Sequence, residues 1–159
     1  MDGDAKVGVG RPRGRYRGRL DEKGRLKLPA DFQEYFRAIG AIKLFVTTFG
    51  DRMARIYPDW SWDKVEASLS QPGENARALK AVLFVAQDLG GNAEMDVQGR
   101  VTFPSELREA LGMDGTPLHL VMMGEHIEVF TEAEYQKKKA AAAENVEKGL
   151  ELVEVLGLP

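Results

Sequence analysis

The chain has 159 residues, of which 43% are hydrophobic and 30% are charged, values that are typical of one or two soluble globular domains. It contains no cysteine, which excludes disulfides, thiolate metal sites and a cysteine nucleophile. No apolar run approaches the roughly 18 residues of a membrane span, and the N-terminus lacks the apolar core of a signal peptide. We therefore expect a cytoplasmic protein without membrane contact.

The net charge of −3 is unevenly distributed along the chain. Residues 1–27 carry nine Lys/Arg and four Asp/Glu, a net charge of +5, and the remainder carries a net charge of −8. Eight of the nine cations fall between Arg11 and Lys27. This segment could attract a polyanion, or it could be a solvated basic tail, and position alone leaves both open.

A nine-residue motif occurs twice. Residues 21–29, DEKGRLKLP, recur 75 residues later as residues 96–104, DVQGRVTFP, with Asp, Gly, Arg and Pro identical. Two copies are too few for a solenoid, so the repeat predicts a pseudo-twofold domain. Each half is too small to bury a core alone, and we expect the two halves to pack together.

Both motifs predict the same local structure. A β-prone run leads into an Asp-x-x-Gly turn, and the alternation that follows puts apolar residues on one face and Arg25 or Arg100 on the other. Pro29 and Pro104 end these strands and can begin short helices. The rest of each copy predicts two strands and a helix, at residues 42–48, 54–57 and 59–70 and again at 118–123, 126–130 and 132 onward.

Between the copies, Asn75 can cap a helix that runs to about Ala86, with Ala76, Leu79, Val82 or Leu83, and Ala86 on one face. Gly90-Gly91-Asn92 marks the boundary before the second copy.

The last helix begins at Thr131-x-x-Glu134, a sequence that is typical of a capping box. It carries Val146, Leu150 and Val153 on one stripe. We expect this stripe to pack on its own chain rather than on a partner.

Two Asp-x-x-Gly-Arg turns, each followed by an apolar-x-apolar-Pro strand and a short helix, resemble the MraZ proteins of bacteria, which are double-copy members of the AbrB-like swapped-hairpin group. Phe32, residues 58–62, Leu107-Arg108 and residues 127–130 agree with the same family. The resemblance runs from about Gly14 to the helix after Thr131. Gln33 departs from it, because the family often has arginine there.

The resemblance implies a DNA-binding transcription regulator that acts on repeats in the promoter of the division and cell-wall gene cluster. It also implies a ring-like homo-oligomer whose chains each present both turns to DNA, and hence a nucleoid-associated protein. The family's key motif residues correspond in the first copy to Asp21, Gly24 and Arg25, and in the second copy to Asp96, Gly99 and Arg100. Lys23 matches the usual lysine of the first motif.

The residue chemistry suits duplex DNA, because bound Lys and Arg release counterions and the planar Arg fork fits phosphates or guanine edges. We expect contacts to DNA from Arg25, Arg100, Lys23, Lys27, Arg15, Arg17 and Arg19. We expect Asp21 and Asp96 to brace the turns by accepting turn amides or orienting the guanidinium, and Gly24 and Gly99 to allow positive φ. The cations around Arg25 predict that the first copy contributes more affinity than the second.

Other interpretations stay open at this point. Each Asp–Arg pair could simply lock its hairpin. The chain could also be an oligomeric scaffold or interaction module whose basic arm binds an acidic protein, or an antitoxin-like AbrB relative.

Several chemistries lack support. Gly8-x-Gly10-x-x-x-Gly14 has the wrong spacing for a dinucleotide loop. His119 and His126 could meet on neighbouring strands, but two histidines without a third ligand make a poor metal site. No carboxylate pair or serine triad stands out. We expect no enzyme, no cofactor, no metal and no small-molecule substrate.

We therefore predict an α+β fold of two intertwined AbrB-like β-hairpin units that form a pseudo-twofold, barrel-like domain with short flanking helices. The aromatic residues Phe45, Phe49, Tyr57, Trp60 and Trp62 are expected in its core. The predicted parts are a flexible basic arm (1–13), the first repeat (14–71), a linking helix and loop (72–91), the second repeat (92–139) and a C-terminal helix (140–159).

Overall fold

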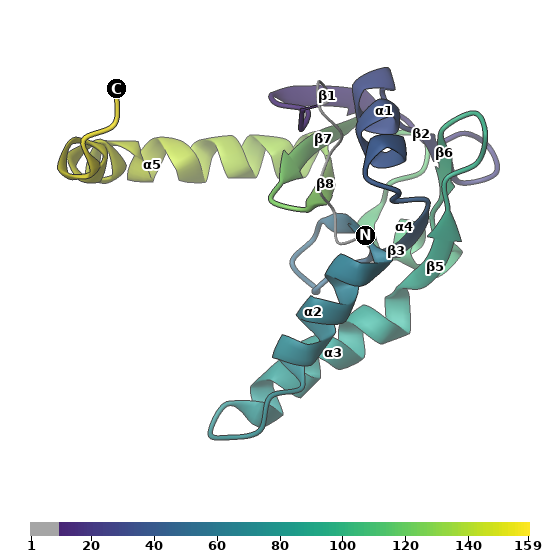
Figure 1. The fold of residues 1–159 in the computed structure, drawn as a ribbon, viewed down its shortest axis with the longest axis horizontal. Coiled ribbons are helices and arrows are strands. Elements are labelled where there is room, and N and C mark those ends of the chain that lie inside the picture. The colour runs from purple at the N-terminus through teal and green to yellow at the C-terminus, as the bar shows by residue number, and fades with distance from the viewer. Residues whose placement is uncertain (1–9) are drawn as a thin grey trace.

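A computed structural model describes residues 10–159 and shows an α+β arrangement of strands and helices (Figure 1). The predicted arm at residues 1–13, and the glycines before residue 10, lie largely outside the described residues. The first repeat contains β1 (Arg15–Gly18), β2 (Arg25–Lys27), α1 (Ala30–Ala38), β3 (Lys43–Thr47), β4 (Ala54–Pro58) and α2 (Asp59–Leu69). After α3 (Ala76–Leu89), the second contains β5 (Gly91–Glu94), β6 (Arg100–Thr102), α4 (Ser105–Leu111), β7 (Leu118–Met123), β8 (His126–Thr131) and α5 (Glu132–Leu156).

The two repeats are interleaved by strand exchange. In the six-stranded sheet, of order β1-β7-β8-β4-β3-β5, β1 pairs with β7 of the second repeat, and its counterpart β5 pairs with β3 of the first. The equivalent strands β4 and β8 pair with each other at the centre. The intertwined units predicted from the sequence are therefore confirmed. The sheet ends at β1 and β5, and no pairing among residues 10–159 closes it into a barrel.

A separate two-stranded ribbon joins the two motifs. Leu26 of β2 lies opposite Val101 of β6, the same position of the repeat, with Arg25 opposite Thr102 and Lys27 opposite Arg100. The bonds that flank the ribbon are also symmetric, because the Leu28 amide donates to the Gly99 carbonyl and the Phe103 amide donates to the Gly24 carbonyl, both at 2.9 Å. The pseudo-twofold axis thus passes through the Leu26–Val101 pair.

Apolar residues from both repeats form one shared core. Equivalent positions of the two motifs are buried together: Leu26 with Val101, Leu28 with Phe103, and Phe32 with Leu107, each at most 1% exposed. Neither repeat encloses this core alone, as expected from the small size of each half.

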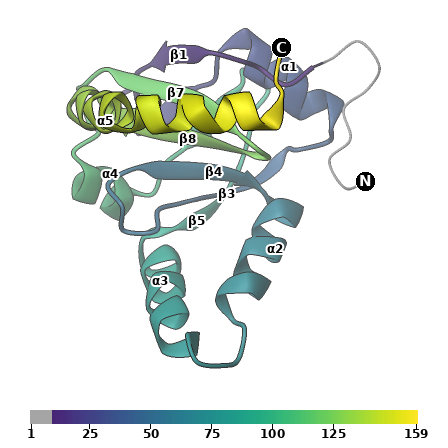
Figure 2. The same cartoon turned by 90° about the vertical axis from the view of Figure 1, so that its left-hand side faces the viewer.

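The helices α2 and α3 form a hairpin that projects from one side of the sheet (Figures 1 and 2). At its base, Phe45, Tyr57 and Trp62 are buried with Ala86, and Phe49 packs against them, so the predicted aromatic core is confirmed there. Trp60 packs against the main core instead. Asn75 precedes α3, but its side chain makes no capping hydrogen bond, which corrects that detail.

The predicted packing of the last helix on its own chain is wrong. None of the residues of α5 is buried, and Val146, Leu150 and Val153 are 57%, 59% and 39% exposed. Only the start of α5 is anchored, where the Thr131 hydroxyl accepts a bond from the Glu134 amide at 3.4 Å. The remainder leads away from the sheet (Figure 1). Within residues 10–159, none of the helices is both long enough and apolar enough for a membrane crossing.

The pairing at the pseudo-axis predicts a large stability loss for Leu26→Ala. Because Leu26 is fully buried where the repeats meet, its truncation leaves a cavity that should lower the free energy of unfolding by about 2–5 kcal/mol in urea titrations. Val97→Ala is the control, because Val97 is 95% exposed and its truncation should change stability by less than about 0.5 kcal/mol. Equal midpoints for Leu26→Ala and the parent chain would contradict the central position of this pair.

Candidate nucleic-acid interface

The first Asp-x-x-Gly-Arg turn is held by one carboxylate. Asp21 Oδ1 accepts bonds from the amides of Lys23 and Arg25, both at 2.9 Å, and Oδ2 accepts the Arg25 Nε–H at 2.8 Å. The Gly24 amide donates to the Asp21 carbonyl at 3.0 Å and closes the turn. Only Nε of the Arg25 side chain is engaged within residues 10–159, which leaves both terminal nitrogens for a further partner.

The second turn repeats this arrangement. Asp96 Oδ1 accepts from the amides of Gln98 and Arg100 at 2.9 Å, and Oδ2 accepts the Arg100 Nε–H at 2.7 Å. The side chains of Arg25 and Arg100 are 26% and 28% exposed. Both arginines are thus oriented but not enclosed, and the geometry serves the locked-hairpin interpretation and a contact role at once.

Glycine is required in both turns. Gly24 and Gly99 have φ of +76° and +78°, a region that L side chains rarely adopt. A Cβ at Gly99 would lie 1.9 Å from the Gln33 side chain, and a Cβ at Gly24 would lie 2.5 Å from the Arg108 guanidinium. Since residues 33 and 108 are equivalent in the repeat, each turn is covered by the helix of the other copy.

Because each helix covers the turn of the other copy, two arginines that are distant in the sequence lie at the turns, and the sequence did not predict them there. Arg108 lies over the first turn and donates to Asp114 at 3.0 Å, while its Nε is buried without a hydrogen-bond partner. At the second turn, Arg37 donates to the Val97 carbonyl and to Gln33, both at 3.3 Å. The spacing of four between Gln33 and Arg37 on α1 is the sequence signal that could have found this pair.

The outward face of the β2–β6 ribbon is cationic. Residues that are opposite in an antiparallel pair share one face, so Arg25, Lys27, Arg100 and Thr102 all lie on the side away from buried Leu26. Lys27 is exposed and directly opposite Arg100. Like charges in that position are destabilising by themselves, and an anion would relieve their repulsion.

The structure distributes the remaining predicted cations unevenly. Lys23 is exposed at the tip of the first turn. Arg17 and Arg19 line an open hollow of about 660 Å³ together with Lys27 and the polar residues Gln33 and Gln98. Arg15 is not brought to this side, because its Nη1 donates to His119 Nδ1 at 3.0 Å and its guanidinium lies 4.5 Å from the Tyr135 ring centre.

A smaller hollow beside α4 is acidic. It has a volume of about 370 Å³ and is lined by Pro104, Ser105 and Glu106, with Asp88 at its edge. The basic hollow lies beside the second turn, to which Gln98 belongs and which Gln33 covers. The hollow beside the first turn is instead lined by Asp21, Glu22, Arg108 and Asp114.

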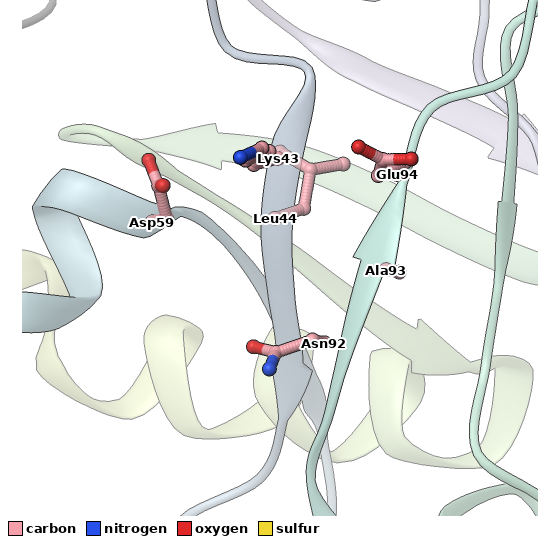
Figure 3. Close-up of a pocket in the computed structure, with 6 residues that line it drawn as sticks. All are labelled: Lys43, Leu44, Asp59, Asn92, Ala93 and Glu94. Carbon is pink, nitrogen blue, oxygen red and sulfur yellow. The ribbon is translucent and has the colours of Figure 1, made fainter.

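A third hollow, of about 480 Å³, lies at the β3–β5 edge of the sheet. Figure 3 shows Lys43 between the carboxylates of Asp59 and Glu94. Two acids beside one lysine do not suit a polyanion, and we exclude this hollow from the nucleic-acid interface.

The two histidines do not meet, which corrects that expectation. Although β7 and β8 are paired, His119 lies opposite Phe130 and His126 lies opposite Met123, near different ends of the ladder. His119 donates from Nε2 to Glu132 at 2.7 Å, and His126 contacts Glu128 at 3.3 Å. Among residues 10–159, no three His, Asp or Glu side chains are grouped as a metal site would require.

Comparisons with known proteins find relatives of this chain. The family described as "MraZ protein, putative antitoxin-like" matches residues 91–151. Proteins named "Transcriptional regulator MraZ" are 42% identical in Acidobacterium capsulatum and 43% identical in Koribacter versatilis, each over 65% of this chain and 70% or 71% of the relative. The relative with the same name in Acidovorax sp. is 34% identical over 77% of this chain and 84% of its own length.

The chain belongs to the MraZ family. The name of these MraZ relatives describes regulators of transcription and not enzymes.

The turn aspartates titrate below their ordinary range. The Arg25 amide, with the Arg25 side chain and the Lys23 amide, lowers the pKa of Asp21. The Arg100 amide, with the Arg100 side chain and the Gln98 amide, lowers the pKa of Asp96 in the same way. Since these hydrogen bonds favour the charged carboxylate, each turn depends on an ionised aspartate.

This shift predicts a pH-dependent effect of Asp21→Asn/Asp96→Asn on stability. A carboxyl group whose folded pKa lies below its unfolded value of about 3.9 stabilises the fold above that pH and loses the effect as pH falls through the folded pKa. The variant should therefore melt below the parent chain at pH 7, and the difference in Tm should shrink below about pH 4. Glu22→Gln removes an exposed charge of the same turn as the control. A difference in Tm that stays constant from pH 7 to pH 3 would contradict the brace.

Proposed function

We propose that this MraZ-family protein is a sequence-specific DNA-binding transcription regulator whose contact surface is the outward face of the β2–β6 ribbon and its two turns. The observation that carries this proposal is the juxtaposition of Arg25, Lys27 and Arg100 on one exposed face, with Lys27 directly opposite Arg100. Such a face accumulates like charge that a phosphate backbone would neutralise.

The geometry of the arginines supports DNA over a small anion. Asp21 and Asp96 each accept the Nε–H, and within residues 10–159 the terminal nitrogens are left for a phosphate or a guanine edge. A two-stranded antiparallel ribbon also has the width that the major groove of B-DNA admits. In this proposal arginine contacts DNA, aspartate braces the turn, and Gly24 and Gly99 shape it.

The other cations have graded roles. Lys23 lies at the tip of the first turn, and Arg17 and Arg19 line the hollow that also contains Lys27 and Gln98. We propose that all three contact phosphates, which fix position without reading sequence. Arg15 contributes least, because its guanidinium is bonded to His119 and stacked on Tyr135.

The two turn tips differ in a way that divides the work between them. The first tip has charged Glu22 and Lys23, and the second has Val97, 95% exposed, and Gln98. Gln can pair with an adenine edge and an apolar side chain can contact a thymine methyl group. We assign a phosphate contact to Lys23 at the first tip and base contacts to Val97 and Gln98 at the second.

The family membership supplies the finer parts of the proposal. We propose that the chain acts on repeats in the promoter of the division and cell-wall gene cluster, as a ring-like homo-oligomer in which every chain presents both turns to DNA. A nucleoid-associated location inside the cell follows from that activity.

The cations that neighbour Arg25 in the sequence predict the ranking of two substitutions. In a gel-shift titration with DNA from upstream of its own gene, Arg25→Ala and Arg100→Ala should each weaken binding by about 1–3 kcal/mol, with the larger loss for Arg25→Ala. Lys64→Ala removes an exposed cation on α2 and should bind like the parent chain. Full affinity for Arg25→Ala beside a loss for Arg100→Ala would overturn the ranking, and full affinity of the double variant would overturn the proposal.

Phosphate contacts also predict a steep dependence on salt. The logarithm of the association constant should fall linearly with the logarithm of salt concentration between about 50 and 200 mM, with a slope near −0.9 for each neutralised phosphate. Lys27→Ala should make that slope shallower by about one per binding chain, measured by fluorescence anisotropy. A salt-independent affinity would exclude phosphate-driven binding.

The scaffold alternative is kept because α5 offers an exposed surface of its own. A scaffold has no need for two oriented arginines on one face. Retained partner binding by an Arg25→Ala/Arg100→Ala protein, without any DNA binding by the parent chain, would favour it.

A further inference from the structure

The C-terminal half of α5 is not covered by any other part of residues 10–159. The helix has 25 residues, a length of about 37 Å, and none of them is buried. Its first part leads away from the sheet and its last part runs across that direction, away from α3 of the same chain (Figures 1 and 2). Asn145 donates its side-chain amide to the Ala141 carbonyl at 2.9 Å, a bond of the kind that accompanies helix bending.

This segment has an apolar stripe with an acidic flank, and Leu152, Val155 and Leu156 are exposed on its other sides. Val146, Leu150 and Val153 follow the spacing of a single helix face. Glu147 and Glu154 lie one residue further along than Val146 and Val153 and therefore beside the stripe. Exposing these hydrophobic side chains to water costs free energy, and contact with another surface would remove that cost.

A second unpartnered stripe lies on α3. Phe84 is 70% exposed, and Arg77, Lys80 and Ala81 share its face at helical spacing and are exposed as well. The acid on this face, Asp88, lies one turn beyond Phe84, and Gln87 is bonded to Glu66 of α2. The first two turns of the face thus combine a large aromatic side chain with two cations and no acid.

We propose that the C-terminal half of α5 docks on the α3 face of a second copy of this chain, with Leu150 and Val153 against Phe84 and the glutamates beside Arg77 and Lys80. The charges decide between this and pairing of two α5 helices. Two copies of residues 144–154 would bring four glutamates from each chain together against one lysine from each, whereas α3 offers cations to the same acids.

A contact between different surfaces is head-to-tail, and it closes into a ring or continues as a filament. The chain has both surfaces, so each copy can make two such contacts. This deepens the homo-oligomer named under the proposed function by assigning its interface. It does not depend on DNA binding.

Two variants test the docking directly by light scattering after size exclusion and by native mass spectrometry. Leu150→Asp/Val153→Asp and Phe84→Asp should each convert the oligomer to monomers, with the dissociation constant raised on the order of tenfold or more per side chain. All three side chains are exposed in the single chain, so an unchanged Tm of the monomer checks that it still folds. Val155→Asp, 82% exposed on the opposite side of α5, is the matched control and should assemble like the parent chain.

Mixing the two variants separates the interface from its alternatives. Each variant retains one intact surface, so an equimolar mixture should form a 1:1 heterodimer and stop there, although each alone is monomeric. If Leu150→Asp/Val153→Asp were monomeric while Phe84→Asp stayed fully assembled, the proposal would be overturned in favour of α5–α5 pairing. Assembly of both variants like the parent chain would overturn it altogether.

A charge exchange adds an independent arm. Arg77→Glu/Lys80→Glu should weaken self-association, and adding Glu147→Lys/Glu154→Lys in the same chain should restore it. Absence of rescue would contradict the pairing of these charges. In the same experiment, Arg25→Ala/Arg100→Ala should assemble normally, so loss of DNA binding and loss of assembly are distinguishable.

Discussion

The exchange of strands between the two repeats is the constraint on which the rest of the structure depends. At its centre Leu26 faces Val101, and the amides of Leu28 and Phe103 bond to the glycine carbonyls of the opposite turn. One face of the ribbon completes the core, and the other face carries the cations. The candidate site therefore forms only when the two repeats fold together, because each repeat supplies one strand of the ribbon and neither can pair it alone.

Within that ribbon, each aspartate performs two structural tasks with its two oxygens. Oδ1 takes the turn amides, and Oδ2 fixes the guanidinium of the residue that starts the strand. A serine or asparagine could supply an acceptor for the amides but no charge for the arginine. The positive φ and the cover by residue 33 or 108 then leave glycine as the residue that fits behind the turn.

Much of this could be predicted because it is local or repeated. The alternation around Arg25 and Arg100 predicted the buried and outward faces, and the repeat itself predicted the pseudo-symmetry. Features that depend on contacts between the copies could not be read in the same way. Gln33 lies against Gly99, which is distant in the sequence. Arg37 reaches Val97 only because α1 of the first copy covers the turn of the second. The two histidines lie on paired strands, but the register of the pairing places them near different ends. The stripe on α5 has the pattern of a packed helix, and a pattern does not name the surface that covers it.

Carrying both motifs in one chain allows the two turns to differ, which a symmetric dimer of single-copy chains cannot do. The differences lie outside the shared core. Asp, Gly and Arg are kept in both copies, whereas Lys23 corresponds to Gln98 and Lys27 corresponds to Thr102. These differences between the two turns give the ribbon a direction. A directed ribbon binds a duplex in one orientation better than in the other, and a head-to-tail assembly of such chains would repeat that orientation from one copy to the next.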